Sequence, residues 1–191
     1  MNLERQKENF KNHVASFTDY GNIKIVDFKN PNSIEYRIRF LFEEDYYRLH
    51  ISGDLGELIA CNYKNMCFEE FTDFVNNTGY FEEKIICMNR AIYAYDEDLA
   101  REQLKAKIEE YDAWDDFMED RFDFEDQEDV LDDILVDFDN KCGISKEGYE
   151  ELQKGFCDAW EFAYDIGKES TGILELYMMA FKLAMEQLKG E

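Results

Sequence analysis

The spacing of apolar residues changes near residue 95 from mostly alternating to helical, and this change limits the fold more than any other feature. Before it, apolar and polar side chains alternate, and the clearest row is Ile34, Tyr36, Ile38, Phe40 and Phe42. Alternation of this kind is typical of a strand with one buried face. Beyond Asp96 the apolar residues recur every three or four positions, which predicts amphipathic helices.

The first 95 residues are expected to form an α+β part. Leu3, Phe10, Val14 and Phe17 have roughly helical spacing, which predicts an amino-terminal helix. Alternating segments then predict a small antiparallel sheet of about three or four strands. In the "SGDLGE" turn, Gly53 or Gly56 is expected to supply a positive φ angle. The pattern from 81 to 95 fits strands or a loop equally.

Residues 96–191 are expected to form an acidic helical part. No Gly-, Ser- or Pro-rich linker precedes it, so we expect it to pack on the first part. The predicted organisation is therefore α+β, with domains at 1–95 and 96–191: an amino-terminal helix and small sheet, followed by helices.

The segment from Glu109 to Asp139 holds sixteen of the 45 acidic residues and one basic residue, Arg121. Large apolar residues recur within it at helical spacing. Burying each of them contributes about 1.5–3 kcal/mol, which exceeds the roughly 0.2–0.5 kcal/mol lost for each like-charged pair on a helix. A disordered acidic tail normally lacks such regular apolar residues. Folded helices with outward-facing acids are the favoured interpretation.

If this segment is largely helical, it covers about 46 Å, or roughly 3 Å per carboxylate. One DNA strand carries a phosphate about every 3.4 Å. The acids could therefore mimic DNA toward a basic protein, or they could simply keep the protein in solution, and the residues leave both hypotheses open. The residues expected to contact a partner are Asp115, Asp116, Glu119, Asp120, Asp123, Glu125, Asp126, Glu128, Asp129, Asp132 and Asp133.

The chain carries no recognisable catalytic motif, and we expect no enzymatic activity, cofactor or metal. His13 and His50 are its two histidines, and neither a nucleophile elbow nor a phosphate-binding GxxxxGK[ST] loop is present. The five cysteines include no CxxC pair, so we expect reduced thiols. "DFDNKCGISKEGYEEL" departs from a calcium loop at Lys141 and Gly148, which favours a plain loop between helices.

The formal charge of −24 opposes direct binding to nucleic acid or to an anionic membrane, because both are polyanions. A basic protein is the expected partner. No signal peptide or membrane-spanning run is evident, so we expect a cytoplasmic protein, monomeric or homodimeric.

Small, highly acidic α+β proteins of this kind resemble DNA-mimic inhibitors from phages and mobile elements, including anti-restriction and anti-CRISPR proteins. "YRIRFLFEEDYYRLHISGDLGELIACNY" is similar to the amino-terminal part of uncharacterised phage proteins and of a group of Cas9 inhibitors, over roughly residues 20–95. The resemblance implies inhibition of a CRISPR effector such as Cas9, in the host cytoplasm, at a surface where arginines read DNA.

Two other functions remain open. One is an adaptor that binds a protein through an apolar groove or a sheet edge, with the charge serving only solubility. The other, less supported by the residues, is a metal-dependent hydrolase that uses clustered carboxylates.

Overall fold

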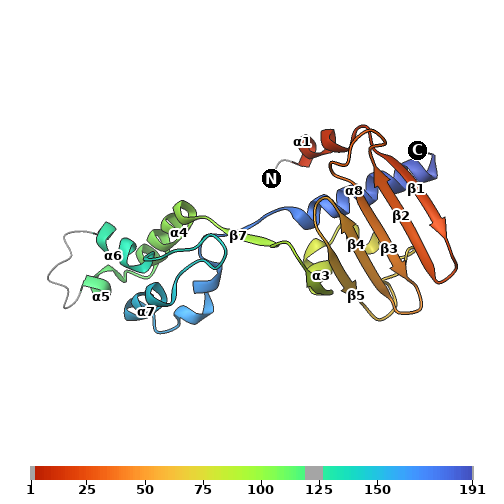
Figure 1. The fold of residues 1–191 in the computed structure, drawn as a ribbon. Helices are drawn as coiled ribbons and strands as arrows, with labels where there is room; N and C mark the ends of the chain where they lie inside the picture. Colours follow the sequence, from red (N-terminus) through yellow and green to blue (C-terminus); the bar gives the residue numbers. More distant parts are fainter. Residues whose placement is uncertain (1–2, 119–126, 191) are drawn as a thin grey trace. The chain divides into compact units, whose positions relative to one another are not determined.

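The computed structural model describes residues 3–118 and 127–190, and the chain divides into two compact units (Figure 1). Met1–Ile92 and Gly172–Glu191 together form the sheet unit, and Tyr93–Thr171 form the inserted unit. The chain leaves the sheet unit after Ile92 and returns to it at Gly172. The inserted unit is therefore an insertion between two elements of the sheet unit.

In the sheet unit, the described residues form a six-stranded antiparallel meander in which each strand pairs with the next. The strands are β1 (Val14–Asp19), β2 (Ile23–Lys29), β3 (Ile38–Glu43), β4 (Arg48–Gly53), β5 (Leu58–Cys61) and β6 (Ile85–Met88). The helices are α1 (Leu3–Lys7), which continues as a 3-10 turn (Glu8–Phe10), α2 (Thr72–Val75), α3 (Thr78–Glu82) and α8 (Ile173–Lys189).

The core of this unit lies between one face of the sheet and α8. The strand register aligns Val26 with Phe40 and Phe40 with Ile51, so alternate residues form one buried apolar layer. Figure 1 shows α8 lying along that face. The centre of its Phe181 ring lies 5.1 Å from the centre of the Phe40 ring and 4.8 Å from that of the Phe71 ring.

The inserted unit has its own elements and its own core. They are β7 (Tyr93–Tyr95), α4 (Glu97–Glu110), α5 (Trp114–Met118), α6 (Gln127–Ile134), α7 (Lys146–Gly155), two 3-10 turns (Ala159–Glu161 and Ala163–Asp165) and β8 (Lys168–Ser170). The core residues include Leu104, Ile108, Phe117, Leu131 and Leu152. β7 pairs with β8 through Tyr93 and Ser170, so the two ends of the insertion lie side by side.

Local sequence explains where several elements begin. Asp96 caps α4 by accepting a hydrogen bond from the Leu99 amide at 2.8 Å, and Ser145 caps α7 by accepting one from Gly148 at 2.9 Å. The expected turn in "SGDLGE" is confirmed: Gly53 and Gly56 have φ angles of 148° and 118°. A Cβ on Gly53 would lie 2.0 Å from the Arg37 carbonyl oxygen, so only glycine fits there.

The expected α+β class with an antiparallel sheet is confirmed, but the amino-terminal helix was predicted too long. The helical turns end at Phe10, and Val14 and Phe17 lie in β1. Two apolar side chains are too few to distinguish helical from strand spacing, and the pairing of β1 with β2 makes this segment a strand. The sheet is also larger than expected, because the undecided residues Ile85–Met88 form β6.

The chain divides differently from the expected boundary at its carboxy-terminal end. The prediction grouped 96–191 as one helical part, whereas α8 packs in the sheet unit and β8 is a strand. The spacing of apolar residues predicts that α8 is a helix, but it carries no information about which core the helix joins. Within the described residues, no helix has the length and apolar character needed to cross a bilayer.

Candidate functional site

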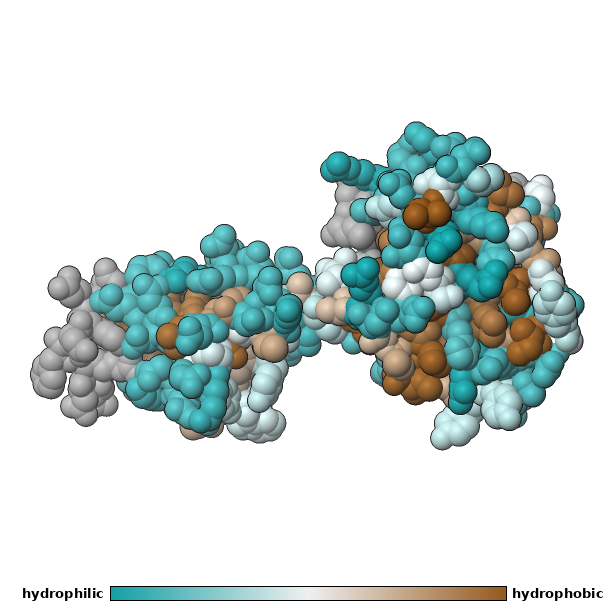
Figure 2. Space-filling view, in the orientation of Figure 1, coloured by the Kyte–Doolittle hydropathy of each residue, from teal (hydrophilic) through white to brown (hydrophobic). Residues whose placement is uncertain are grey.

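The acidic residues of α6 lie on the outward side of the helix, opposite a buried apolar face. Val130, Leu131 and Ile134 are fully buried in the core of the inserted unit. Glu128 and Asp132, four residues apart, are exposed. The amphipathic pattern thus orients these carboxylates as the sequence predicts. Figure 2 shows hydrophilic side chains over much of the visible face of this unit.

Two of the predicted contact residues already hold cations of the same chain. Arg101 of α4 donates to Glu128 Oε2 at 3.1 Å through Nη1 and to Asp132 Oδ1 at 2.6 Å through Nη2. Lys105 Nζ lies 3.8 Å from Glu128 Oε1. The hydrogen bond to Asp132 is the largest effect that raises the pKa of Arg101. The hydrogen bond and the charge of Glu128 raise it further. Glu128 and Asp132 therefore join α6 to α4 through ion pairs, and both remain exposed to solvent.

The other predicted contact residues are distributed unevenly. Asp115 and Asp116 lie on α5 and are exposed. Asp129 and Asp133 lie on α6, and both take part in interactions within the chain. The remaining five lie outside the described residues: Glu119, Asp120, Asp123, Glu125 and Asp126.

The condition for a line of carboxylates about 46 Å long, that the helical rise extend along the segment, is not met in the described part of the segment. α4 ends at Glu110, Asp112 has a φ angle of 52°, and α5 begins only at Trp114. The backbone turn at Asp112 allows Ala113 and Phe117 to enter the core. A continuous 46 Å line of carboxylates, spaced like a phosphate strand, is therefore not available.

Charge is nevertheless concentrated in the inserted unit as a whole. Tyr93–Thr171 contain 27 acidic and eight basic residues, a formal charge of −19, which leaves −5 for the sheet unit. Acids outside the predicted segment contribute, among them Asp158, Glu161 and Asp165 on the two 3-10 turns. The predicted segment, Glu109–Asp139, carries −15 of this charge, and the remaining acids of the unit lie outside it.

Two exposed aromatic residues beside those acids were not predicted from the sequence. Trp160 follows Tyr149, Leu152 and Phe156 at helical spacing, which predicts a buried position on one helix face, whereas the structure exposes both Trp160 and Tyr164. The neighbouring alanines, Ala159 and Ala163, occupy the core instead. Hydrophobicity favours the opposite arrangement, so no local pattern pointed to these residues.

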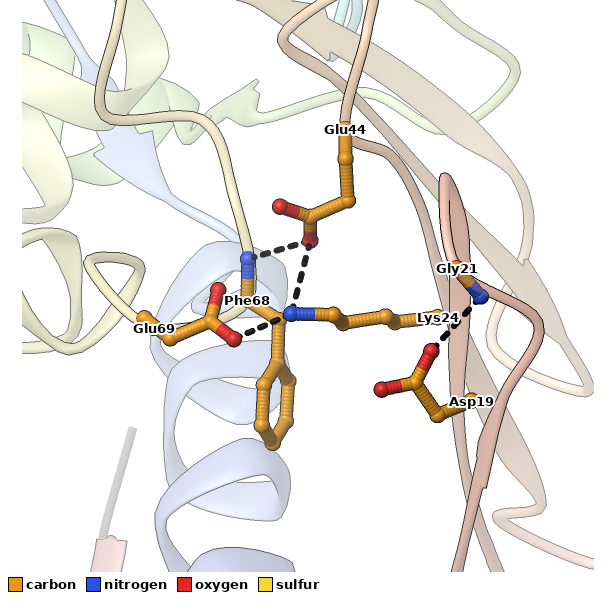
Figure 3. Close-up of polar contacts among 6 residues, drawn as sticks. All are labelled: Asp19, Gly21, Lys24, Glu44, Phe68 and Glu69. Atoms are coloured by element: carbon orange, nitrogen blue, oxygen red, sulfur yellow. Dashed lines mark hydrogen bonds and ion pairs between the residues drawn. The ribbon is translucent and has the colours of Figure 1, made fainter.

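A second polar cluster lies in the sheet unit, where Glu44, Cys67 and Glu69 bring possible metal ligands within 4.8 Å of one another. Figure 3 shows Glu44 and Glu69 of this cluster with Lys24. The ammonium group of Lys24 lies between the two carboxylates: it donates to Glu69 and lies 4.0 Å from Glu44 Oε1. Glu44 Oε1 also accepts the Phe68 amide hydrogen at 3.0 Å. Because a lysine holds the position that a divalent cation needs, this cluster is an ion-pair network of the fold.

The protonation states in this cluster agree with that interpretation. The hydrogen bond from Lys24 lowers the pKa of Glu69, and the same bond raises the pKa of Lys24. Burial raises the pKa of the Cys67 thiol, which favours its protonated form over the thiolate that binds metal.

The outer face of the sheet holds a polar hollow of about 370 Å³, whose lining includes Asp27, Arg39 and Ser52. Arg39 donates to both carboxylate oxygens of Asp27, at 2.7 and 2.9 Å. His50 is half-buried, with Nε2 3.2 Å from Glu43 Oε2. Asp27 and Arg39 thus satisfy each other, and no nucleophile with an adjacent base is assembled among the described residues that line the hollow.

The segment compared with a calcium loop forms a turn between α6 and α7. Asp139 Oδ1 accepts the Lys141 amide hydrogen at 2.6 Å, and the Asp139 and Gly143 backbones pair. Ser145 ends this turn and caps α7. The expected loop between two helices is thus the observed structure.

No family model, curated protein or solved structure matches this chain. The charge distribution and the side-chain geometry are therefore the basis for a functional proposal.

Proposed function

We propose that this is a non-enzymatic binding protein whose inserted unit occupies a basic, nucleic-acid-binding surface of another protein. The observation that carries the proposal is the formal charge of −19 on Tyr93–Thr171, against −5 on the rest of the chain. Solubility alone gives no reason to gather the charge in one unit, whereas a single basic partner surface does.

Electrostatics supports binding over catalysis. A concentrated negative field steers a basic partner toward the unit and accelerates its association. Arg101 forms ion pairs with two carboxylates of this unit. The unit has only eight basic residues for 27 carboxylates, so most of its negative charge is not neutralised. A surface of this charge repels nucleic acid and attracts the proteins that bind it.

The resemblance to phage inhibitors suggests a CRISPR effector such as Cas9 as the partner. Such effectors hold nucleic acid in positively charged channels and read the PAM with arginines. Carboxylates form short, charge-assisted hydrogen bonds with arginine, and so could exclude DNA from these surfaces. DNA mimicry here means a carboxylate-rich surface, without the regular spacing of a phosphate strand.

The test is competition between this protein and PAM-bearing duplex DNA for guide-loaded Cas9. One variant reverses four acids of the inserted unit to lysine: Asp115, Asp116, Asp158 and Glu161. The matched control reverses four exposed acids of the sheet unit: Glu35, Glu57, Glu70 and Asp73. Both variants change the net charge equally, so any difference reports the location of the charge.

We expect the first variant to lose at least about tenfold in affinity and the control to lose little, because short-range contacts outweigh net charge at physiological salt. Equal losses in both variants would contradict a localised site. Retention of full competition by the first variant would contradict the proposal itself.

A second candidate function, a protein adaptor, is favoured by tyrosines at one end of the sheet. Tyr20, Tyr46 and Tyr63 are exposed and follow β1, β3 and β5, which end on the same side of the meander. Exposed tyrosines are typical of protein-binding loops. Binding through this end would change little with salt and would be lost in a Tyr46→Ala/Tyr63→Ala variant.

A further inference from the structure

The segment from Phe156 to Ile166 buries small residues and exposes large ones. Ala159 and Ala163 are 0% and 4% exposed, whereas Trp160 and Tyr164 are 62% and 70% exposed. Burial of a tryptophan removes far more apolar surface from water than burial of an alanine. Stability alone therefore favours the opposite arrangement, and the exposure of both aromatic residues calls for another cause.

Packing at both ends holds this segment in its register. Phe156 is buried, with its ring 5.7 Å from the Phe117 ring and 5.3 Å from the Phe162 ring. Ile166 is buried at the other end. The Tyr95 hydroxyl donates to the Tyr164 carbonyl oxygen at 3.2 Å. The fold thus presents Trp160 and Tyr164 from an anchored segment.

Other rings of this unit are covered by lysines of the same chain. Lys107 Nζ lies 4.1 Å from the centre of the Phe162 ring and 5.3 Å from that of Tyr111. Lys168 Nζ lies 4.4 Å from the centre of the Tyr93 ring. Over Trp160 and Tyr164, by contrast, the described part of the chain places no cation. The Tyr149 ring stacks beside that of Tyr164, with the ring centres 6.4 Å apart. The Trp160 ring and the exposed part of the Tyr164 ring remain open to a cation from outside.

Carboxylates flank the open rings along the same segment. Asp158 and Glu161 are exposed, and no described cation forms an ion pair with either of them. Asp165 differs, because Lys168 Nζ lies 2.8 Å from its Oδ1. Aromatic faces and unpaired carboxylates therefore occur together within a few residues.

We propose that Trp160 and Tyr164, with Asp158 and Glu161, form an arginine-binding hot spot that contacts the partner of the inserted unit. This inference rests on the proposed function and specifies its chemistry. A guanidinium group is planar: it stacks on an indole or phenol ring and donates paired hydrogen bonds to a carboxylate, which a lysine ammonium does less well. Tryptophan, tyrosine and arginine also dominate the energetics of protein interfaces.

An arginine-binding hot spot should prefer arginine over lysine at equal charge, whereas attraction by charge alone should not. The test measures binding of fluorescein-labelled octa-arginine and octa-lysine to the full-length protein by anisotropy, at several salt concentrations. We expect octa-arginine to bind at least about tenfold more tightly. In a Trp114→Phe background, octa-arginine should also change the emission of Trp160, because Trp160 is then the single tryptophan.

Trp160→Ala is expected to bring the affinity ratio of the two peptides close to one while leaving salt-dependent binding in place. Trp160→Phe should restore part of the preference, which a purely structural role would not predict. Tyr63→Ala is the matched control, since Tyr63 is 91% exposed but lies in the sheet unit. This control should keep the full preference.

The outcomes separate the two proposals. Salt-dependent binding of both peptides, with a ratio that Trp160→Ala leaves unchanged, would overturn the hot spot and leave the acidic binding function standing. Absence of binding to either peptide at low salt would overturn both.

Discussion

His13 links the amino-terminal turn to the loop before β3, and its environment requires a neutral ring. It is buried, and its Nε2 lies 3.1 Å from the Tyr36 carbonyl oxygen, so this nitrogen carries the hydrogen. Nδ1 is buried, with no hydrogen-bond partner among residues 3–118 and 127–190. Protonation would add an unsatisfied donor there, and burial accordingly lowers the pKa of His13 below 6.5.

This environment predicts a loss of stability under mildly acidic conditions. Below pH 6.5 the unfolded chain takes up a proton at His13 before the folded chain does, so the free energy of unfolding falls until the lowered folded-state pKa is reached. His13→Phe should flatten this part of the profile, as measured by urea denaturation between pH 7 and pH 5. An unchanged slope would contradict the assignment.

Lys24 has the opposite electrostatic role, because it holds Glu44 and Glu69 together (Figure 3). Its side chain is largely buried, so Lys24→Met should lower the free energy of unfolding by roughly 1–3 kcal/mol. The matched control is Lys11→Met, which removes an exposed pair with Glu8 and should cost less than about 0.5 kcal/mol.

The Lys24 cluster also has a pH signature. Lys24 lowers the pKa of Glu69 below 4.5, so its stabilising contribution is present above pH 4.5 and is lost as the pH falls through the lowered value. The difference in stability between the wild type and Lys24→Met should therefore shrink in acid. A difference that stays constant from pH 7 to pH 3 would exclude this role.

Individual residues were predictable from sequence where the cause was local. Phe40 and Phe42 alternate within one strand, and their burial followed from that pattern alone. The pairing of Arg101 with Asp132 joins residues that are 31 positions apart, and the exposure of Trp160 depends on Phe156 and Ile166 packing on either side. Neither has a signal in the neighbouring sequence.

At the scale of elements, Gln187 of α8 closes part of the free edge of β1. Its Oε1 accepts the Ala15 amide hydrogen at 2.9 Å, and its Nε2 donates to the His13 carbonyl oxygen at 3.0 Å. The side-chain amide thus satisfies backbone groups that another strand would otherwise pair with. Edges covered in this way resist association with other chains.

Gln187→Ala should cost about 1 kcal/mol of stability and increase hydrogen exchange at the Ala15 amide. Gln187→Glu is the informative control, because it keeps the acceptor for Ala15 and removes the donor to His13. If Ala15 exchanged equally fast in all three proteins, Gln187 would not be protecting the edge.

α8 also joins the end of the chain to its beginning through Phe181, whose ring packs on Phe40, Phe42 and Phe71. Phe181→Ala should destabilise the sheet unit by about 3–5 kcal/mol. Leu152→Ala, in the core of the inserted unit, should by contrast leave unfolding of the sheet unit unchanged. Thermal unfolding followed by near-UV circular dichroism would distinguish the two transitions.

The sequence predicts which segments form helices but not which core each helix joins. Helices α4, α6, α7 and α8 follow from apolar periodicity, which is a property of each segment. The placement of α8 in the sheet unit is a long-range choice between two apolar cores, and periodicity does not encode it. Val14 and Phe17 fit a helix or a strand by spacing, and only pairing with β2 resolves them.

At the scale of the whole molecule, the insertion separates a sheet unit of modest charge from a strongly acidic unit. Tyr93 and Ser170 are paired, so the sheet unit could be closed by a short Gly/Ser linker from Ile92 to Gly172. Because the two cores are separate, the closed chain should fold and retain its β-sheet. Loss of the sheet in this variant would show that the sheet unit depends on the insertion.

If charge on the inserted unit drives binding, the affinity must depend on salt concentration through that unit. The measurement compares log Kd against log salt concentration for guide-loaded Cas9 with the full chain and with the closed chain that lacks Tyr93–Thr171. We predict that the full chain loses at least about tenfold in affinity between 50 and 200 mM salt, and that the closed chain binds weakly with little slope. Equal affinities and slopes for the two chains would contradict the account.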